Sequence, residues 1–295
     1  MAEALFRRLA IIGIGLIGSS VARGAREYGG IAECLVICDA DLDVLARAQA
    51  LGLGDEYEAD PARAVAGADC VMLCAPVGAY TALAAAIGPH LAAGAILTDV
   101  GSTKQSVLRD VGPLVPPTVS FVPGHPIAGT EFSGPDAGLA DLFRGRWCLL
   151  TPPPGTDEAA VRRIRALWGI LGAQTAVMDA PHHDRVCAIV SHLPHLIAFT
   201  ICGTADDLAD ETRQEVLQFA ASGFRDFTRI ASSDPVMWRD IFLNNKEALL
   251  EMLARFSEDA QAMARAVRWG DAAYIEDKIV RSRKIRKSLI DLKQA

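Results

Sequence analysis

The sequence predicts an α/β protein, with a doubly wound parallel sheet in its first part and only helices in its second part. Short apolar runs alternate with helix-like stretches up to about residue 180, a glycine-rich turn follows the first run, and runs of strand length stop after residue 180. Continuous apolar strands separated by helices are typical of a parallel sheet covered on both faces. We therefore expect two domains, residues 1–180 and residues 181–295.

The expected elements follow from the period of the apolar residues. Strands are expected at Leu9–Gly13, Cys34–Asp39, Cys70–Pro76, Ala95–Val100, Val119–Val122, Trp147–Thr151 and Thr175–Met178, with helices between them that include Ile17–Tyr28, Asp41–Leu51, Tyr80–Leu91 and Asp157–Leu171. A 3.6-residue apolar period predicts the later helices Pro181–Ala205, Glu211–Ala221, Val236–Arg268 and Gly270–Leu292. The wide apolar stripe on the third of these predicts burial against other helices, some of them from a second subunit.

Length and charge limit the class of protein. The 295 residues are too many for one ordinary core, and the composition, 51% hydrophobic and 22% charged, is that of a folded protein. The net charge of −7 gives no reason to expect nucleic acid as a partner. No stretch reaches the roughly 20 apolar residues that span a bilayer, and the N-terminus lacks a convincing signal peptide. We therefore expect a cytoplasmic protein with no membrane partner.

The cysteines are odd in number and form no Cys-x-x-Cys motif. Several lie inside apolar runs, which buried thiols in a reducing compartment explain better than disulfides or zinc. Free thiols are therefore expected at Cys34, Cys38, Cys70, Cys74, Cys148, Cys187 and Cys202.

A G-x-G-x-x-G motif, Gly13-Ile-Gly15-Leu-Ile-Gly18, joins the first expected strand to the first expected helix. Gly13 permits the tight turn, Gly15 lets the backbone approach a pyrophosphate, and Gly18 lets the helix pack close to the sheet. The phosphates would lie at the helix N-terminus, beside Leu16 and Ile17, where free N–H groups and the helix dipole favour negative charge. The motif in this context predicts a Rossmann-type dinucleotide-binding domain.

An acidic residue, Asp39, ends the second expected strand, 21 residues past Gly18. Its carboxylate is placed to accept hydrogen bonds from the adenosine ribose. Asp41 and Asp43 follow, with no Arg or Lys before Arg47, so a 2′-phosphate would be repelled and NAD is preferred to NADP. The alternative is that Asp39 only caps a helix. Ala75, Pro76 and Val77 end another strand at the ligand edge and are expected to line the cofactor, or are an ordinary strand end.

Four further segments carry polar groups where a packed core would not favour them. They are Thr98-Asp-Val-Gly-Ser102-Thr-Lys104, Pro123-Gly-His125-Pro-Ile-Ala-Gly-Thr-Glu131, Ser191-His-Leu-Pro-His195, and the stretch from Gly223-Phe-Arg-Asp-Phe-Thr-Arg229-Ile to Trp238-Arg239. Together they resemble the prephenate/arogenate (cyclohexadienyl) dehydrogenase family, from the glycine loop to the helical half, and no functional side chain is missing. The resemblance implies NAD-dependent oxidation of a cyclohexadienyl alcohol with loss of carbon dioxide, in a homodimer joined through its helical domains.

The resemblance assigns the family's catalytic histidine to His125. A neutral imidazole at the ligand edge is suited to take the hydroxyl proton near pH 7; the alternative is a loop histidine that shapes a turn before Pro126. Aromatisation of the ring and departure of the carboxylate supply the driving force, so no metal is expected. Ser102 is expected to orient His125 or the substrate hydroxyl and to lie near the cofactor. The alternative for Ser102 is that it caps a helix starting at Thr103.

Substrate contacts are expected from the helical half. The resemblance makes His195 a substrate contact with Ser191 beside it on the same helix face, whereas His192 points elsewhere. Arg229 is the expected carboxylate clamp, with a surface arginine as the alternative, and Glu131 is expected to restrain it or gate access.

Several features of this half have structural alternatives. Trp238 is expected to wall the pocket or to be core, and Arg225 and Asp226 to form an interface ion pair. Pro194 should bend its helix. A metal site among His182, His183, His192 and His195 is unfavoured, because no Cys or carboxylate completes a ligand set.

Two other functions remain open. One is another two-domain NAD(P)-dependent hydroxyacid dehydrogenase, which would need a catalytic lysine where the first helix of the second domain carries histidines. The other is an NAD-sensing module without catalysis, which would not need His125, Ser102 and Arg229 together. The sequence does not distinguish prephenate from arogenate as substrate.

Overall fold

The computed structural model describes residues 4–292. Its sheet has the order β3-β2-β1-β4-β5-β6-β7-β8. The strands are β1 (Phe6–Ile12), β2 (Ala32–Cys38), β3 (Glu56–Glu58), β4 (Cys70–Leu73), β5 (Ile96–Asp99), β6 (Ser120–Pro126), β7 (Trp147–Leu150) and β8 (Gln174–Val177). The seven expected strands are all present, and the expected α/β class with a doubly wound sheet is confirmed. The edge strand β3 was missed, because Glu56-Tyr57-Glu58 has no apolar run to signal it.

The sheet is parallel from β3 to β6, so the carboxyl ends of β1, β4, β5 and β6 meet at one edge. The expectation of a wholly parallel sheet was wrong at β7, which pairs antiparallel to β6, whereas β8 runs parallel to β7. This pairing also extends β6 past the expected end at Val122, because Gly124, His125 and Pro126 pair with Leu150, Leu149 and Cys148. His125 therefore lies in a strand and not in the loop after one.

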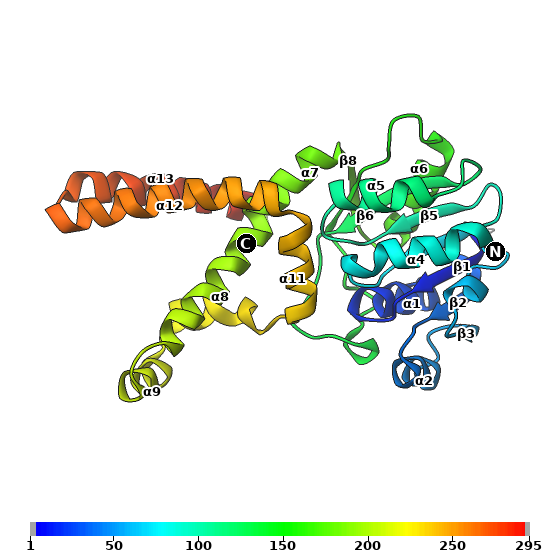
Figure 1. Cartoon of the computed structure of the whole chain (residues 1–295), viewed down its shortest axis with the longest axis horizontal. Helices are drawn as coiled ribbons and strands as arrows, with labels where there is room; N and C mark the ends of the chain where they lie inside the picture. Colours follow the sequence, from blue (N-terminus) through cyan, green and yellow to red (C-terminus); the bar gives the residue numbers. More distant parts are fainter. Residues whose placement is uncertain (1–3, 293–295) are drawn as a thin grey trace. The chain divides into compact units, whose positions relative to one another are not determined.

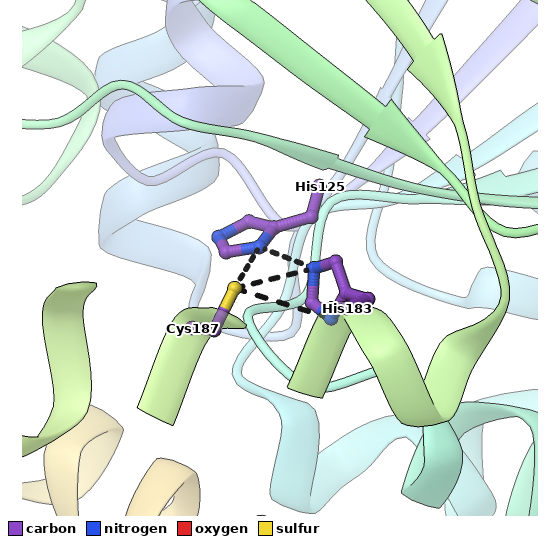
Figure 2. A group of neighbouring side chains, drawn as sticks. All are labelled: His125, His183 and Cys187. Carbon is purple, nitrogen blue, oxygen red and sulfur yellow. Dashed lines mark hydrogen bonds between the residues drawn. The ribbon is translucent and has the colours of Figure 1, made fainter. Parts of the chain in front are cut away.

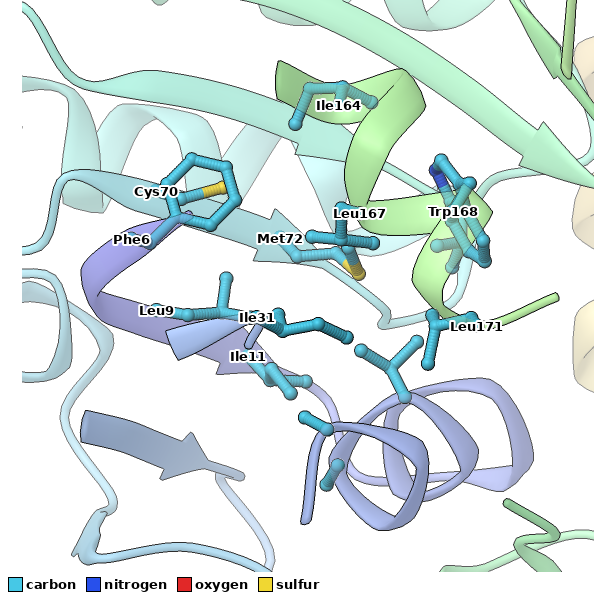
Figure 3. Close-up of a cluster of buried hydrophobic side chains, with 14 of the residues drawn as sticks. Phe6, Leu9, Ile11, Ile31, Cys70, Met72, Ile164, Leu167, Trp168 and Leu171 are labelled. Atoms are coloured by element: carbon cyan, nitrogen blue, oxygen red, sulfur yellow. The ribbon is translucent and has the colours of Figure 1, made fainter. Parts of the chain in front are cut away.

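Helices cover both faces of the sheet (Figure 1). They are α1 (Leu16–Tyr28), α2 (Leu42–Ala50), α3 (Pro61–Ala64), α4 (Tyr80–Ile87), α5 (Gln105–Val111) and α6 (Glu158–Ile170), with short 3₁₀ turns η1 (Val77–Ala79), η2 (Gly88–His90), η3 (Gly112–Leu114) and η4 (Pro135–Ala137). One core cluster joins β1 and β4 to α1 and α6 through side chains such as Leu9, Met72 and Trp168, which Figure 3 shows. The other joins the opposite face to α3, α4 and α5.

All elements after β8 are helical, as predicted. They are α7 (Ala180–Cys187), a π-helical turn η5 (Ala188–His192), α8 (Leu193–Asp206), α9 (Asp210–Phe219), α10 (Ser222–Thr228), the 3₁₀ turn η6 (Arg229–Ser232), α11 (Pro235–Asn244), α12 (Lys246–Trp269) and α13 (Ala272–Asp291). The π turn ends at His192, two residues before Pro194, which has no N–H for the α-helical ladder. The segment from α7 to α8 thus departs from regular helix where the proline predicted a distortion.

The long helix expected at Val236–Arg268 is two helices, α11 and α12, which meet at Asn245. The Asn245 backbone leaves helical geometry, at φ −118° and ψ 32°, and its side chain is buried. Two compact units are distinguished by contacts, Met1–Lys246 and Glu247–Ala295. Within the second, Lys278 of α13 donates to Asp259 of α12 at 2.7 Å. A boundary between functional domains at residue 180 stays a prediction.

One segment passes the length and hydropathy test for a membrane span. Residues Ala180–Asp206 form 27 continuous helical residues with a mean hydropathy of 1.7 in the best window, of which 28% is buried. The expectation that no such stretch exists was therefore wrong by this criterion. The first turn of this segment carries the buried polar residues His183 and Asp184. His183 bonds to His125 of β6, and Asp184 accepts from the backbone of Lys104 directly before α5, so that end of the helix packs on protein.

All seven cysteines lie within the described residues and are free thiols, as expected.

Candidate active site

The glycine turn after β1 leaves room for a pyrophosphate. Gly13 has φ +95°, and a Cβ there would lie 2.6 Å from the Ala75 nitrogen, while a Cβ on Gly18 would lie 2.1 Å from the Gly13 oxygen. A Cβ on Gly15 would meet nothing within 4 Å. Gly15 is also the N-cap of α1 and has no side-chain capping bond. The start of α1 thus has open space beside Gly15 and no capping side chain, as an anion-binding helix start with free N–H groups at Leu16 and Ile17 requires.

Asp39 lies directly after β2, beside this turn. Its Oδ2 accepts from the Ile14 nitrogen at 2.9 Å, and its Oδ1 accepts from the Asp41 nitrogen at 3.0 Å. The helix-cap alternative for Asp39 is wrong, because the N-cap of α2 is Asp41, whose side chain accepts from Asp43 and Val44. Each Asp39 oxygen keeps a further lone pair, which leaves room for ribose hydroxyls.

The end of β4 lies against the same turn. The Cys74 nitrogen donates to the Ile12 oxygen at 2.7 Å, and Pro76 is the N-cap of η1, which begins at Val77. Ala75 lies so close to Gly13 that its nitrogen would clash with any side chain at that position. The structure thus brings Ala75, Pro76 and Val77 to the edge where the nucleotide turn lies.

A buried ion pair fixes the loop after β5. Asp99 and Lys104 are both fully buried, and the Lys104 Nζ donates to Asp99 Oδ2 and, at 2.8 Å, to the Gly124 oxygen. Asp99 also accepts from the nitrogens of Gly101, at 2.8 Å, and Gly124, at 3.1 Å. The pair ties the loop that carries Ser102 to the strand that carries His125. Both residues stand in the Thr98–Lys104 segment, but their pairing has no local signal in the sequence.

His125 is 9% exposed and its ring bonds to a residue that sequence reasoning did not select. Its Nδ1 lies 2.9 Å from the Nε2 of His183, at the start of α7 (Figure 2). Burial, assisted by the charges of His183, Lys104 and His192, lowers the pKa of His125 well below its ordinary value. The ring is therefore neutral at pH 7. In the described chain no hydrogen bond joins His125 to Ser102, so a role for Ser102 toward the substrate hydroxyl stays a prediction.

Asp184 completes a chain of three side chains. The His183 Nδ1 lies 2.8 Å from Asp184 Oδ1, and both residues are fully buried. Asp184 also accepts from the backbone nitrogens of Lys104, at 2.8 Å, and Gln105, at 2.9 Å, at the start of α5. Burial alone would raise the pKa of Asp184, but the bonds from His183 and these two nitrogens lower it below its ordinary value. The helix after Ser102 is thus capped by Asp184, not by Ser102.

The tautomers of His125 and His183 follow from the charge of Asp184. An ionised Asp184 accepts the proton on His183 Nδ1, so His183 Nε2 has only a lone pair. Burial, opposed by the bond to Asp184, lowers the pKa of His183, so this ring is neutral as well. His125 must then donate from Nδ1 to His183, which leaves the lone pair on His125 Nε2. The His125 ring is thus held in one tautomer by its bond to His183, which Asp184 orients.

The expected substrate residues of the helical half come together around Trp238. The His195 ring stacks on Trp238 with centroids 3.6 Å apart, and its Nδ1 donates to the backbone oxygen of Ser191 at 2.9 Å. Burial and then the charge of Arg229 lower the pKa of His195, whereas the bond to Ser191 raises it. Trp238 is buried with an unpartnered Nε1 within residues 4–292, so it lies in the core and also presents a free donor.

His192 is fully buried and its ring lies edge-on to Trp238, with centroids 6.2 Å apart. Its Nδ1 accepts from the Asn245 Nδ2 at 3.0 Å, and Asn245 also donates to the Asp184 oxygen at 2.9 Å. Its Nε2 is buried with no partner in the described residues. Burial lowers the pKa of His192 to about 4. Asn245, which sequence reasoning missed, thus links the histidine helix to the break between α11 and α12.

Arg229 and Glu131 meet, as expected, with the Arg229 Nη1 3.4 Å from Glu131 Oε2. The Arg229 side chain is 61% exposed and the Glu131 side chain 29%. The contact is thus long and open to solvent on the arginine side, so its role toward a ligand carboxylate stays a prediction. Arg225 and Asp226 are both exposed, and no ion pair joins them among the described side chains, so their pairing across an interface stays a prediction.

The doubly wound sheet, its G-x-G-x-x-G turn and the buried histidine at the same edge define an NAD-dependent oxidoreductase. Residues 21–177 match the family pattern of the prephenate dehydrogenase nucleotide-binding domain, and residues 179–280 that of the prephenate dehydrogenase dimerization domain. The chain belongs to the prephenate dehydrogenase family.

Individual relatives agree with this membership. The chain is 40% identical to the cyclohexadienyl dehydrogenase of Zymomonas mobilis subsp. mobilis over 97% of each protein. It resembles the crystal structure of prephenate dehydrogenase from A. aeolicus in complex with hydroxyphenyl propionate and NAD+, with a TM-score of 0.87, 32% identity, and 98% of this chain and 99% of that chain covered. It also resembles the arogenate dehydrogenase of Synechocystis, with a TM-score of 0.79, 25% identity, and 95% and 99% covered.

Proposed function

We propose that this protein catalyses the NAD-dependent oxidative decarboxylation of prephenate to 4-hydroxyphenylpyruvate, of arogenate to tyrosine, or of both, in tyrosine biosynthesis. The observation that carries the proposal is the chain Asp184–His183–His125, which holds a neutral histidine base at the edge where the nucleotide turn lies. Family membership supplies the substrate class, because its named relatives act on these two compounds.

The base acts on the ring hydroxyl of the substrate. Bound NAD accepts the hydride from the ring carbon that carries this hydroxyl. His125 Nε2 takes the hydroxyl proton, and its positive charge is shared through His183 toward the ionised Asp184. Loss of carbon dioxide leaves its electron pair in the ring, which becomes aromatic. The phenolate oxygen then recovers a proton from His125, so that the base is neutral again after each turnover.

The cofactor is held by the groups at the sheet edge. Gly13, Gly15 and the first N–H groups of α1 bind the pyrophosphate, and Asp39 binds the adenosine ribose. Ala75, Pro76, Val77 and Ser102 line the nicotinamide half. The open space at Gly15 and the spare lone pairs on Asp39 support these assignments.

The substrate is held by the groups around Trp238. Arg229 pairs with the substrate carboxylate after leaving Glu131, since a guanidinium matches a carboxylate bidentately. His195 contacts the substrate side chain, beside Ser191. The buried, unpartnered donor Trp238 Nε1 supports a polar ligand here, because such a group otherwise costs about 1–3 kcal/mol.

The protein acts as a homodimer in the cytoplasm. The dimerization-domain match covers residues 179–280, and this part of the chain exposes many large apolar side chains that a partner would bury. They include Ile189, Val190, Leu217, Phe219, Leu243, Leu250, Val267 and Trp269. The nucleotide-binding part is residues 1–180 and the helical part residues 181–295. Light scattering of the purified protein at several concentrations tests the assembly; a monomer throughout would contradict it.

A kinetic experiment tests the function. Purified protein is mixed with NAD or NADP and with prephenate or arogenate, in all four pairings, and formation of reduced nicotinamide is followed by its absorbance. We expect turnover with NAD and at least one of the two substrates. Binding of NAD with no turnover in any pairing would favour an NAD-sensing module instead.

A further inference from the structure

Three potential metal ligands converge behind the catalytic edge. The His125 Nδ1 and the His183 Nε2 lie 2.9 Å apart, and the Cys187 Sγ lies 3.7 Å and 3.5 Å from them, respectively. All three residues are buried, and all three ligand atoms lie within 4.8 Å of one another. Figure 2 shows the side chains pointing toward a common point, two of them from α7. His183 and Cys187 share a helix face because they are four residues apart.

These spacings are close to those of a tetrahedral zinc site. With Zn–N bonds of about 2.0–2.1 Å and a Zn–S bond of about 2.3 Å, ligand nitrogens lie about 3.4 Å apart and nitrogen and sulfur about 3.6 Å apart. The two nitrogen–sulfur distances already match, and the two rings would separate by about half an ångström. A fourth position would remain open to water or a ligand.

The hydrogen bonds around His183 favour its binding to a metal ion through Nε2. A histidine that binds a metal normally donates its other N–H to a carboxylate, which fixes the ring and its tautomer. Asp184 accepts this bond from His183 Nδ1 at 2.8 Å and is itself held by two backbone N–H groups of α5. His183 Nε2 thus presents a lone pair without any change of protonation.

We propose that His125, His183 and Cys187 form an inhibitory site for a thiophilic d¹⁰ divalent cation such as Zn²⁺ or Cd²⁺. The cation binds the Cys187 thiolate, and the thiol proton is released to solvent. It also binds His125 at Nδ1, so the proton of that ring relocates to Nε2. An Nε2 that carries a proton cannot accept one from a substrate hydroxyl. The inhibition rests on the proposed role of His125, whereas the binding of the cation does not.

Binding is measured without turnover. Metal-free protein is titrated with Cd²⁺, and the ultraviolet thiolate-to-metal charge-transfer absorbance is followed. We expect the absorbance to saturate at one cation per chain. The signal should be lost in Cys187→Ser and in Cys187→Ala, and it should be kept in Cys202→Ser, the matched control on α8. An undiminished signal in both Cys187 variants would overturn the site. Two different substitutions are used because one variant alone could misfold. Circular dichroism of each variant shows whether it is folded.

Inhibition is measured against the dehydrogenase reaction. The rate of NADH formation is recorded at increasing Zn²⁺, relative to the uninhibited rate of each variant, and a chelator should restore it. Cys187→Ser should raise the half-inhibiting Zn²⁺ concentration at least about tenfold. Cys202→Ser and His182→Asn, an exposed neighbour of His183, should leave it unchanged. Equal sensitivity of Cys187→Ser and the parent protein would overturn the proposal. If the protein lacks dehydrogenase activity, the Cd²⁺ titration still decides whether the site exists.

Discussion

The Nδ1 atom of His125 lies 2.9 Å from the Nε2 atom of His183. Because His183 is in turn bonded to Asp184, the contact has a direction: His125 donates and His183 accepts. The contact therefore decides which nitrogen of His125 carries a lone pair. The tautomer of His125 thus depends on His183 and Asp184, two residues of another element.

Replacement of the base tests its chemical role. We expect His125→Asn to lower kcat by about 10²–10⁴, the usual contribution of a general base, because an amide cannot take the hydroxyl proton. The affinity for NAD, measured by calorimetry, should stay close to that of the parent, since the cofactor is held by other residues. An unchanged kcat would remove His125 from this role.

Replacement of His183, which is hydrogen-bonded to His125, should change kcat but not KM. His183→Asn should lower kcat by about tenfold or more while KM for the substrate changes little, because His125 would lose its fixed tautomer but the substrate contacts would remain. His182→Asn, one residue away and exposed, is the matched control and should behave as the parent. Equal kcat values for the parent and both variants would show that His183 has no positioning role.

The carboxylate clamp predicts an effect on KM. Arg229→Ala should raise KM for the substrate by roughly ten- to hundredfold, as expected for the loss of a charged hydrogen bond of about 1.5–3 kcal/mol. Arg225→Ala, on the preceding α10, removes an equal charge from an exposed position and serves as the control. Steady-state kinetics of both variants decide the point. If Arg229→Ala kept the parent KM, the clamp would have to be another residue.

Cofactor choice is predicted to depend on the charge of Asp39. Asp39→Asn keeps an acceptor for the Ile14 nitrogen but removes the charge that repels a 2′-phosphate, so the ratio of kcat/KM for NAD to that for NADP should fall by about tenfold or more. Asp43→Asn, in the first turn of α2, is the control. A ratio unaltered by Asp39→Asn would mean that selectivity resides elsewhere.

A buried histidine predicts how stability depends on pH. Burial lowers the pKa of His192 to about 4, from an ordinary value of 6.5. Between these values the unfolded chain binds more protons than the folded one, so the free energy of unfolding falls as pH falls below 6.5. The contribution of His192 at pH 5 is a loss of about 2 kcal/mol relative to pH 7.5.

Urea unfolding at the two pH values measures this loss. His192→Asn, which keeps an acceptor for Asn245, should reduce the pH dependence by about that amount, whereas His182→Asn should not. The same pH dependence in His192→Asn and the parent would contradict the argument.

The nucleotide turn could be predicted from sequence because its determinants are local. The spacing of Gly13, Gly15 and Gly18 fixes a backbone shape within six residues, and Asp39 follows at the end of the next strand. The strand direction of β7 could not be predicted in this way, because the apolar pattern of a run such as Trp147–Leu150 is the same for a parallel and for an antiparallel strand. The short strand β3 and the break at Asn245 were missed because neither alters the apolar period strongly.

Of the residues Asp184, His183 and His125, only His125 could be predicted from the sequence as part of the site. His125 stands in a distinctive motif, but His183 and Asp184 belong to another element 58 and 59 residues later, and only folding brings them together. Their signal in the sequence is the row His182-His183-Asp184 at the start of an apolar helix. The grouping of Cys187 with His125 could not be predicted for the same reason. The four-residue spacing places Cys187 beside His183 on one helix face, but no nearby residue in the sequence indicates that this helix packs against β6.

The tautomer of His125 is the central claim, and nitrogen NMR observes it directly. In protein labelled with ¹⁵N-histidine at pH 7, with the His125 signals assigned by their loss in His125→Asn, the account predicts a neutral ring with the proton on Nδ1 and a lone pair on Nε2. The same ring should lose this preference in His183→Asn. An imidazolium at pH 7, or a neutral ring with its proton on Nε2, would contradict the account.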